Sequence, residues 1–158
     1  MRKFFFGLGI AAAAVILLIA AFIGYGVYVG AGVSKEGGVY ADNAVVTITA
    51  HWDVKELTKR ASPELLKQVK PEVLASLFDW FATLGPLVDY QGSKPLGWRQ
   101  VSGTGGTVIL AEYLCSARYK AGPATIDLVL QKSGSVWKIN RFQVNSDILI
   151  ENKAGRRT

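Results

Sequence analysis

Cysteine and histidine are almost absent from this chain, because Cys115 and His51 are the only residues of their types. A single cysteine permits no internal disulfide, so packing alone must stabilise the fold. Metal centres need clusters of Cys, His, Asp or Glu at matched spacings, and the sequence contains no such cluster. We therefore expect neither a disulfide framework nor a cofactor or metal ion.

Blocks of like charge are also absent. The formal net charge is +6, and Lys and Arg are spread along the chain among the acidic residues. A mild and scattered excess of this kind does not indicate nucleic acid as a partner. The one positive cluster in the C-terminal part, Lys153 with Arg156 and Arg157, falls in residues 149–158, where we expect a solvated basic tail.

A long uncharged run dominates the N-terminal part. It extends from Phe4 to Val29, directly after Arg2 and Lys3. As a helix rising 1.5 Å per residue it would be roughly 39 Å long, enough to cross a hydrocarbon layer of about 30 Å. The run predicts a signal-anchor over residues 1–33, with the lipid bilayer as its partner. Arg2 and Lys3 predict an inner (plasma) membrane protein with a cytoplasmic N-terminus and a periplasmic or extracellular domain.

Two further interpretations of this run stay open. A secretory signal peptide has an apolar region of about 7 to 15 residues, which is shorter than this run, but small residues at positions 30–32 would suit a cleavage site. Gly26 and Gly30 form a small-xxx-small pair through which two membrane helices can approach closely. The chain can therefore associate with itself or with another membrane protein.

The residues after the predicted anchor, 34–158, have the size of one domain with one core. Glycines beside Ser34, Lys35 and Glu36 predict a flexible tether over residues 34–39. Apolar spacing and capping residues then predict short helices, with Asp53 and Ser62 as N-caps. The expected helices cover residues 40–52, 54–60, 63–69 and 71–84.

Beyond Gly85 the apolar period becomes two, which is typical of strands joined by glycine turns. A change of phase between Ile139 and Phe142 predicts a β-bulge near Asn140 and Arg141. Helices followed by a meander predict an α+β domain over residues 40–148, with short helices packed on a curved, about four-stranded antiparallel sheet. The expected strands cover residues 88–98, 107–120, 124–132 and 136–146.

Several short motifs carry a resemblance to a known family. They are Trp52-Asp53, Ala61-Ser62-Pro63-Glu64-Leu65, Leu84-Gly85-Pro86-Leu87, Tyr119-Lys120-Ala121-Gly122-Pro123-Ala124 and Trp137-Lys138-Ile139-Asn140-Arg141-Phe142. Residues 40–146 resemble small bacterial envelope proteins of the nuclear transport factor two-like or cystatin-like cone fold. The resemblance implies a membrane-anchored or lipid-anchored domain of a fold that hosts isomerases, dehydratases and interaction modules. The resemblance identifies no catalytic residue in this sequence.

Candidate acid–base residues are few. His51 can act as a base or as a proton switch near neutral pH, although a lone histidine is more often a surface residue. An isomerase-like pocket would need a carboxylate beside a tyrosine, and the available pieces are Tyr113 or Tyr119 with Asp127 or Glu112. Strand alternation turns Asp127 away from the apolar face, which favours solvent over catalysis.

Other distinctive side chains have structural interpretations. Cys115 falls on the apolar face of its strand, as expected of a small buried thiol. Phe78, Trp80 and Phe81 repeat at helical spacing and are expected in the core. We therefore predict a membrane-anchored, extracytoplasmic, non-enzymatic domain that binds itself, a membrane-protein partner or a small apolar ligand. The alternatives are an isomerase- or dehydratase-like enzyme and a cleaved, secreted protein.

Overall fold

The computed structural model describes residues 2–155, and the chain divides into two units, Met1–Val33 and Ser34–Thr158. The first unit belongs to helix α1 (Arg2–Thr49). Of the described residues, only this helix is long and apolar enough to cross a membrane, with a mean hydropathy of 2.1 in its most apolar window. The side chains of Phe4, Val29 and Lys153 lie outside the description, as do Arg156 and Arg157.

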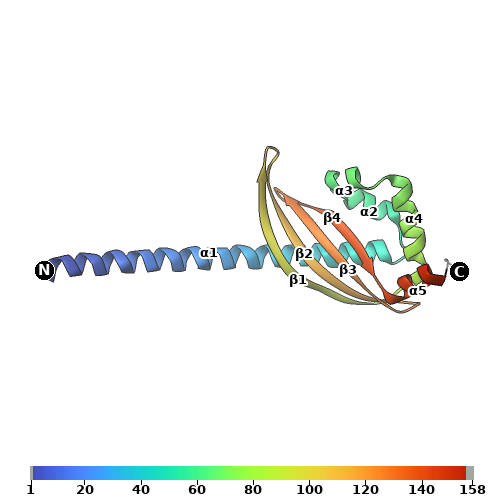
Figure 1. The fold of residues 1–158 in the computed structure, drawn as a ribbon, viewed down its shortest axis with the longest axis horizontal. Helices are drawn as coiled ribbons and strands as arrows, with labels where there is room; N and C mark the ends of the chain where they lie inside the picture. The colour runs from blue at the N-terminus through green and yellow to red at the C-terminus, as the bar shows by residue number, and fades with distance from the viewer. Residues whose placement is uncertain (1, 156–158) are drawn as a thin grey trace. The chain divides into compact units, whose positions relative to one another are not determined.

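The second unit has the predicted α+β fold, with short helices and an open, curved antiparallel sheet (Figure 1). All four expected strands and the short helices between residues 54 and 84 are present. After α1 the elements are α2 (Val54–Arg60), α3 (Pro63–Gln68), α4 (Pro71–Phe81), the 3-10 turn η1 (Ala82–Leu84), β1 (Leu87–Gly103), β2 (Gly106–Tyr119), β3 (Pro123–Ser133), β4 (Val136–Asn145) and α5 (Asp147–Gly155).

The sheet is a meander in the order β1-β2-β3-β4, with every neighbouring pair antiparallel. The predicted bulge in β4 is confirmed, because Val129 pairs with Arg141 while Leu130 pairs with Ile139, which leaves Asn140 as the extra residue. β1 is longer than predicted because its pairing with β2 continues from Arg99 to Gly103, up to the hairpin. Register shifts accommodate Gly92 and Pro95 within the strand.

One face of the sheet, which we call the inner face, is covered by the residue 34–49 part of α1. Ala41, Ala44, Val45 and Ile48 recur at helical spacing and are at most 1% exposed. Alanine at two of these positions lets the helix backbone come close to the strands. The inner-face side chains of β2 are equally buried, and they are Ala111, Tyr113, Cys115, Ala117 and Tyr119.

Residues 34–39 are helical, so the prediction of a flexible tether is wrong. The Tyr113 hydroxyl donates a hydrogen bond to the Ser34 carbonyl at 3.1 Å, and Lys132 pairs with Glu36 at 2.5 Å. The glycines that indicated flexibility have another use, because a Cβ on Gly37 would collide with the Tyr113 hydroxyl. The missing side chain of Gly37 allows a close approach between helix and sheet.

The C-terminal tail also differs from the expectation of a solvated end. Residues 147–155 form α5, and Leu149 is 2% exposed. The Leu149 N–H bonds to the Ser146 carbonyl at 3.2 Å, and Asp147 lies in the first turn, where a carboxylate suits the helix dipole. A buried leucine therefore holds a segment that its charges alone would leave in solvent.

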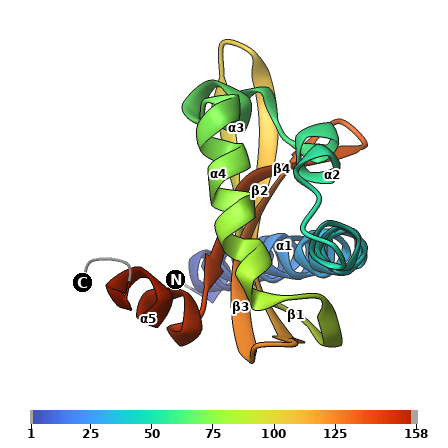
Figure 2. The same ribbon diagram turned by 90° about the vertical axis from the view of Figure 1, so that its right-hand side faces the viewer.

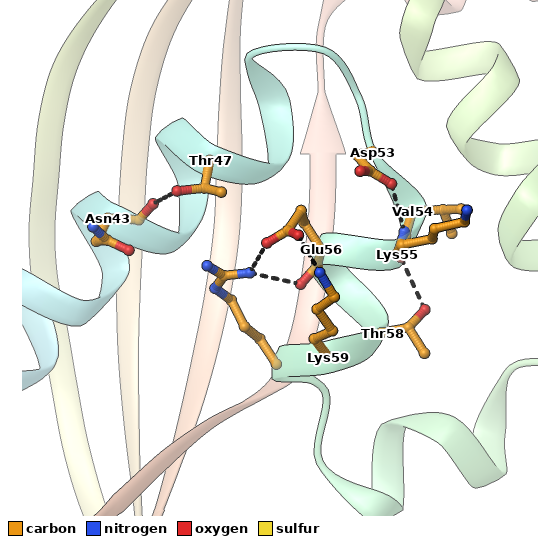
Figure 3. Close-up of polar contacts among 9 residues, drawn as sticks. Asn43, Thr47, Asp53, Val54, Lys55, Glu56, Thr58 and Lys59 are labelled. Carbon is orange, nitrogen blue, oxygen red and sulfur yellow. Dashed lines mark hydrogen bonds and ion pairs between the residues drawn. The ribbon is translucent and has the colours of Figure 1, made fainter.

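The caps that begin α2 and α3 were predicted correctly. Asp53 accepts a hydrogen bond from the Lys55 N–H at 2.8 Å (Figure 3), and Ser62 accepts one from the Leu65 N–H at 3.1 Å. Glu56 does not complete a capping box. Its carboxylate instead pairs with Lys59 and Arg60 one turn further along α2.

Trp52 makes the corner between α1 and α2, and for this reason α1 ends at Thr49, earlier than predicted. Its φ of 52° is left-handed, a conformation that costs about 1 kcal/mol or more for a large side chain. The surroundings hold it there: the Trp52 Nε1–H donates to the Gly85 carbonyl at 2.8 Å. The indole centroid lies 4.9 Å from that of Tyr119 and 5.8 Å from that of Phe81.

Replacing Gly37 with alanine tests the close approach between helix and sheet. We expect Gly37→Ala to lower the free energy of unfolding by about 1–3 kcal/mol, because the new methyl group would overlap the Tyr113 hydroxyl and lie 3.2 Å from the Trp137 ring. Gly38→Ala is the matched control, since its nearest atoms are 3.8 Å away, and it should stabilise the helix by up to about 1 kcal/mol. Denaturant unfolding of the detergent-solubilised protein measures both, and equal effects would contradict the packing described.

Candidate functional site

Four polar side chains meet under the inner face of the sheet. Asp42 of α1 accepts a hydrogen bond from the Tyr90 hydroxyl of β1 at 2.8 Å. The Cys115 thiol of β2 lies against the same hydroxyl, and Tyr113 bonds to the backbone of α1. Each group has a partner inside the domain, so the cluster joins α1 to two strands.

Burial keeps the two tyrosine hydroxyls and the cysteine thiol of this cluster protonated. It raises the pKa of the Tyr113 hydroxyl to about 12 and the pKa of the Cys115 thiol to about 11. Burial, and then the bond to Asp42, also raise the pKa of Tyr90. A thiol and phenols that remain neutral at physiological pH suit a structural role better than that of a base or a nucleophile.

The carboxylates proposed for an isomerase-like pocket lie on the opposite face of the sheet, which we call the outer face. Leu128 pairs with Tyr113 on the inner face, so its neighbour Asp127 points outward, as alternation predicts. Asp127 accepts a hydrogen bond from Asn145 at 2.7 Å, and Glu112 pairs with Arg99 at 3.3 Å. The structure therefore does not bring either carboxylate beside Tyr113 or Tyr119.

His51 is exposed in the turn after α1. No hydrogen bond or ion pair reaches its ring from the described residues, so no partner orients it as a base. Within the part of the chain that the structure describes, no three His, Cys, Asp or Glu side chains gather closely enough to hold a metal ion.

Two hollows flank α3. The larger, of about 760 Å³, lies between α3 and the outer face of the sheet near the hairpin ends, and Glu64, Val108 and Lys138 are among its walls. The second, of about 480 Å³, lies between β4 and the helices α3 and α4, which are drawn in front of the strands in Figure 2. Gln68 and Asn140 belong to both, so the two hollows meet at that point.

The second hollow, which we call the β4 cleft, is lined by both apolar and polar side chains. Its walls include Leu65, Val69, Leu77 and Trp80, all partly exposed. Phe78 and Phe81 are buried as expected, but Trp80 is only half-buried and faces the cleft. Helical spacing places the three aromatic residues on one helix without revealing which of them reaches the surface.

Ser62 fixes the end of the cleft. Its N–H donates to the Ile139 carbonyl at 2.7 Å, and its hydroxyl donates to Asn140 Oδ1 at 3.0 Å. The same hydroxyl oxygen accepts the capping bond of α3, and Ser62 is fully buried. One side chain therefore ties the start of α3 to the bulge of β4, which sets the distance between the two walls.

Comparison with known proteins adds nothing to this geometry. No protein-family model, curated protein or solved structure matches the chain. The resemblance to the nuclear transport factor two-like and cystatin-like proteins therefore remains an expectation from the motifs.

The raised pKa of Cys115 predicts an unreactive thiol. At about pH 8, a group with a pKa near 11 holds about a hundredfold less thiolate than one at the ordinary value of 9.0. We expect iodoacetamide to modify native Cys115 at least about a hundredfold more slowly than the unfolded chain, with the rate rising as the pH approaches 11. Mass spectrometry of quenched samples measures both rates. A native rate within a few-fold of the unfolded one would show that the thiol is accessible and activated.

Proposed function

We propose that the chain is a single-pass membrane protein of the inner (plasma) membrane whose second unit is an extracytoplasmic binding domain without enzymatic activity. Its partners are the bilayer, through the N-terminal helix, and a second molecule bound at the surface of the domain. That molecule is another copy of the chain, a membrane protein or a small apolar ligand.

The exposed apolar surface of α1 is the observation that carries the proposal. From Ile16 to Tyr28, the large apolar side chains are 54–81% exposed. A helix that is apolar on all sides and uncovered is unfavourable in water, and its natural solvent is hydrocarbon. Arg2 and Lys3 precede it, which supports a cytoplasmic N-terminus and an exported domain.

The arrangement of polar residues favours binding over catalysis. Tyr113 and Cys115 are held protonated under α1, and Asp127 lies on the other face of the sheet. An isomerase or dehydratase would need an acid–base pair that converges on one pocket. The β4 cleft offers apolar side chains beside a few polar ones, a surface of the kind that recognises a partner without reacting with it.

Membrane retention tests the anchor. Lysine at the centre of a spanning helix costs about 2.5–3.5 kcal/mol per residue on insertion scales, so Leu17→Lys with Leu18→Lys should remove the protein from the membrane fraction. Leu17→Ala with Leu18→Ala is the matched control and should remain through a carbonate wash. Recovery of the unmodified protein in the soluble fraction, at a mass below 17.1 kDa, would instead support the cleaved, secreted alternative.

Cysteine labelling tests the orientation. In a Cys115→Ala background, we expect Ser135→Cys, in the exposed turn between β3 and β4, to react with a membrane-impermeant maleimide in intact cells. A cysteine inserted after Met1 should react only after lysis. The reverse pattern would mean that the domain lies in the cytoplasm and that the N-terminus is outside.

A further inference from the structure

The open sheet has two edge strands, β1 and β4, which differ in their ability to pair with another chain. β1 meets β2 with register shifts at three places, and Pro95 within it has no N–H to donate. Bulges and prolines of this kind protect an edge from further pairing. β4 has no proline and a single register shift, at Asn140. Its edge is the one suited to accept another strand.

β4 has a free edge on the side away from β3, and the described residues pair with this edge at one position. Ala61 forms a parallel bridge with Ile139, supported by the bond from the Ser62 N–H. Pro63 then begins α3, and the chain leaves the edge. No main-chain hydrogen bond from residues 2–155 reaches residues 141–145 along this free edge. The chain's own strand addition therefore stops after one bridge, beside free backbone groups.

The β4 cleft runs along this unpaired stretch. Residues 140–144 form one wall, and Leu77 and Trp80 of α4 belong to the other. An added strand would bond to β4 through its backbone and place alternate side chains against the half-buried apolar residues of α3 and α4. The free edge selects an extended backbone, and the cleft selects the side chains that the backbone carries. Together they favour an extended peptide over other ligands.

Charge narrows the choice of ligand. Among the described residues that line the cleft, Arg141 is the one charged side chain. It is exposed, and no carboxylate of residues 2–155 pairs with it. A guanidinium in this position favours a carboxylate, which it can bind with two parallel hydrogen bonds.

We propose that the β4 cleft binds an extended segment of a partner protein as an added strand beside residues 141–145. The segment carries apolar side chains at alternate positions and a carboxylate that faces Arg141. This inference rests on the proposed binding function and names the class of partner. It continues the pairing that Ala61 and Ile139 begin, and it does not depend on which side of the membrane the domain occupies.

Selection from a random library of short peptides on beads tests this, with the full-length protein in detergent as bait. We expect enriched peptides to alternate apolar residues and to contain Asp, Glu or a free C-terminal carboxylate, and amidated resynthesis distinguishes these sources. N-methylation of alternate backbone nitrogens should abolish binding in one register. Trp80→Ala and Arg141→Glu should each weaken the best peptide about tenfold or more.

A charge exchange provides the sharpest control. Arg141→Glu should bind a peptide whose acidic residue is replaced by lysine better than the wild type does, while Arg118→Glu, exposed on β2 outside the cleft, should change neither affinity. Equal effects of the two variants, or enrichment without a carboxylate, would overturn the proposal. Dimers that Trp80→Ala dissociates would identify a second copy as the occupant, which also overturns it. If the protein is found in the soluble fraction but the charge exchange gives the expected affinities, the proposal of a membrane anchor is wrong and the proposal of a strand-binding site is supported.

Discussion

The inner face of the sheet is covered by the chain's own helix, and the rest of the domain depends on this packing. Ala41 and Ala44 allow a close approach, while Val45 and Ile48 bury enough surface to contribute about 1.5–3 kcal/mol each. Because the helix occupies the inner face, the polar groups beneath it serve as internal partners. The binding function that we propose therefore depends on the outer face, the strand edges and the grooves beside the short helices.

Local signals predicted most of the fold because the elements of the second unit are short and clearly punctuated. Asp53 and Ser62 cap their helices, and the phase change before Phe142 marks the bulge. The failures arise where tertiary contacts overrode composition. Gly37 indicates flexibility in isolation, but opposite Tyr113 its missing side chain lets a helix pack closely, and no local pattern contains that information.

The sequence predicted the candidate site only in part. Alternation correctly turned Asp127 away from the inner face, since the strand period is two whatever the tertiary context. The β4 cleft was not predicted, because it forms between segments that are distant in sequence. Helical spacing groups Trp80 with Phe78 and Phe81, but only the tertiary packing of α4 decides that Trp80 stays partly exposed.

Ser62 explains why this cleft is a defined surface. Its hydroxyl caps α3 and bonds to Asn140, and its N–H bonds to Ile139, so the helix start and the bulge are positioned by one buried residue. Pro63 then takes the chain away from β4 into α3, and Arg141, next to the bulge, lies in the wall of the cleft. Walls fixed before a ligand arrives reduce the entropy lost on binding, which favours recognition by shape and charge.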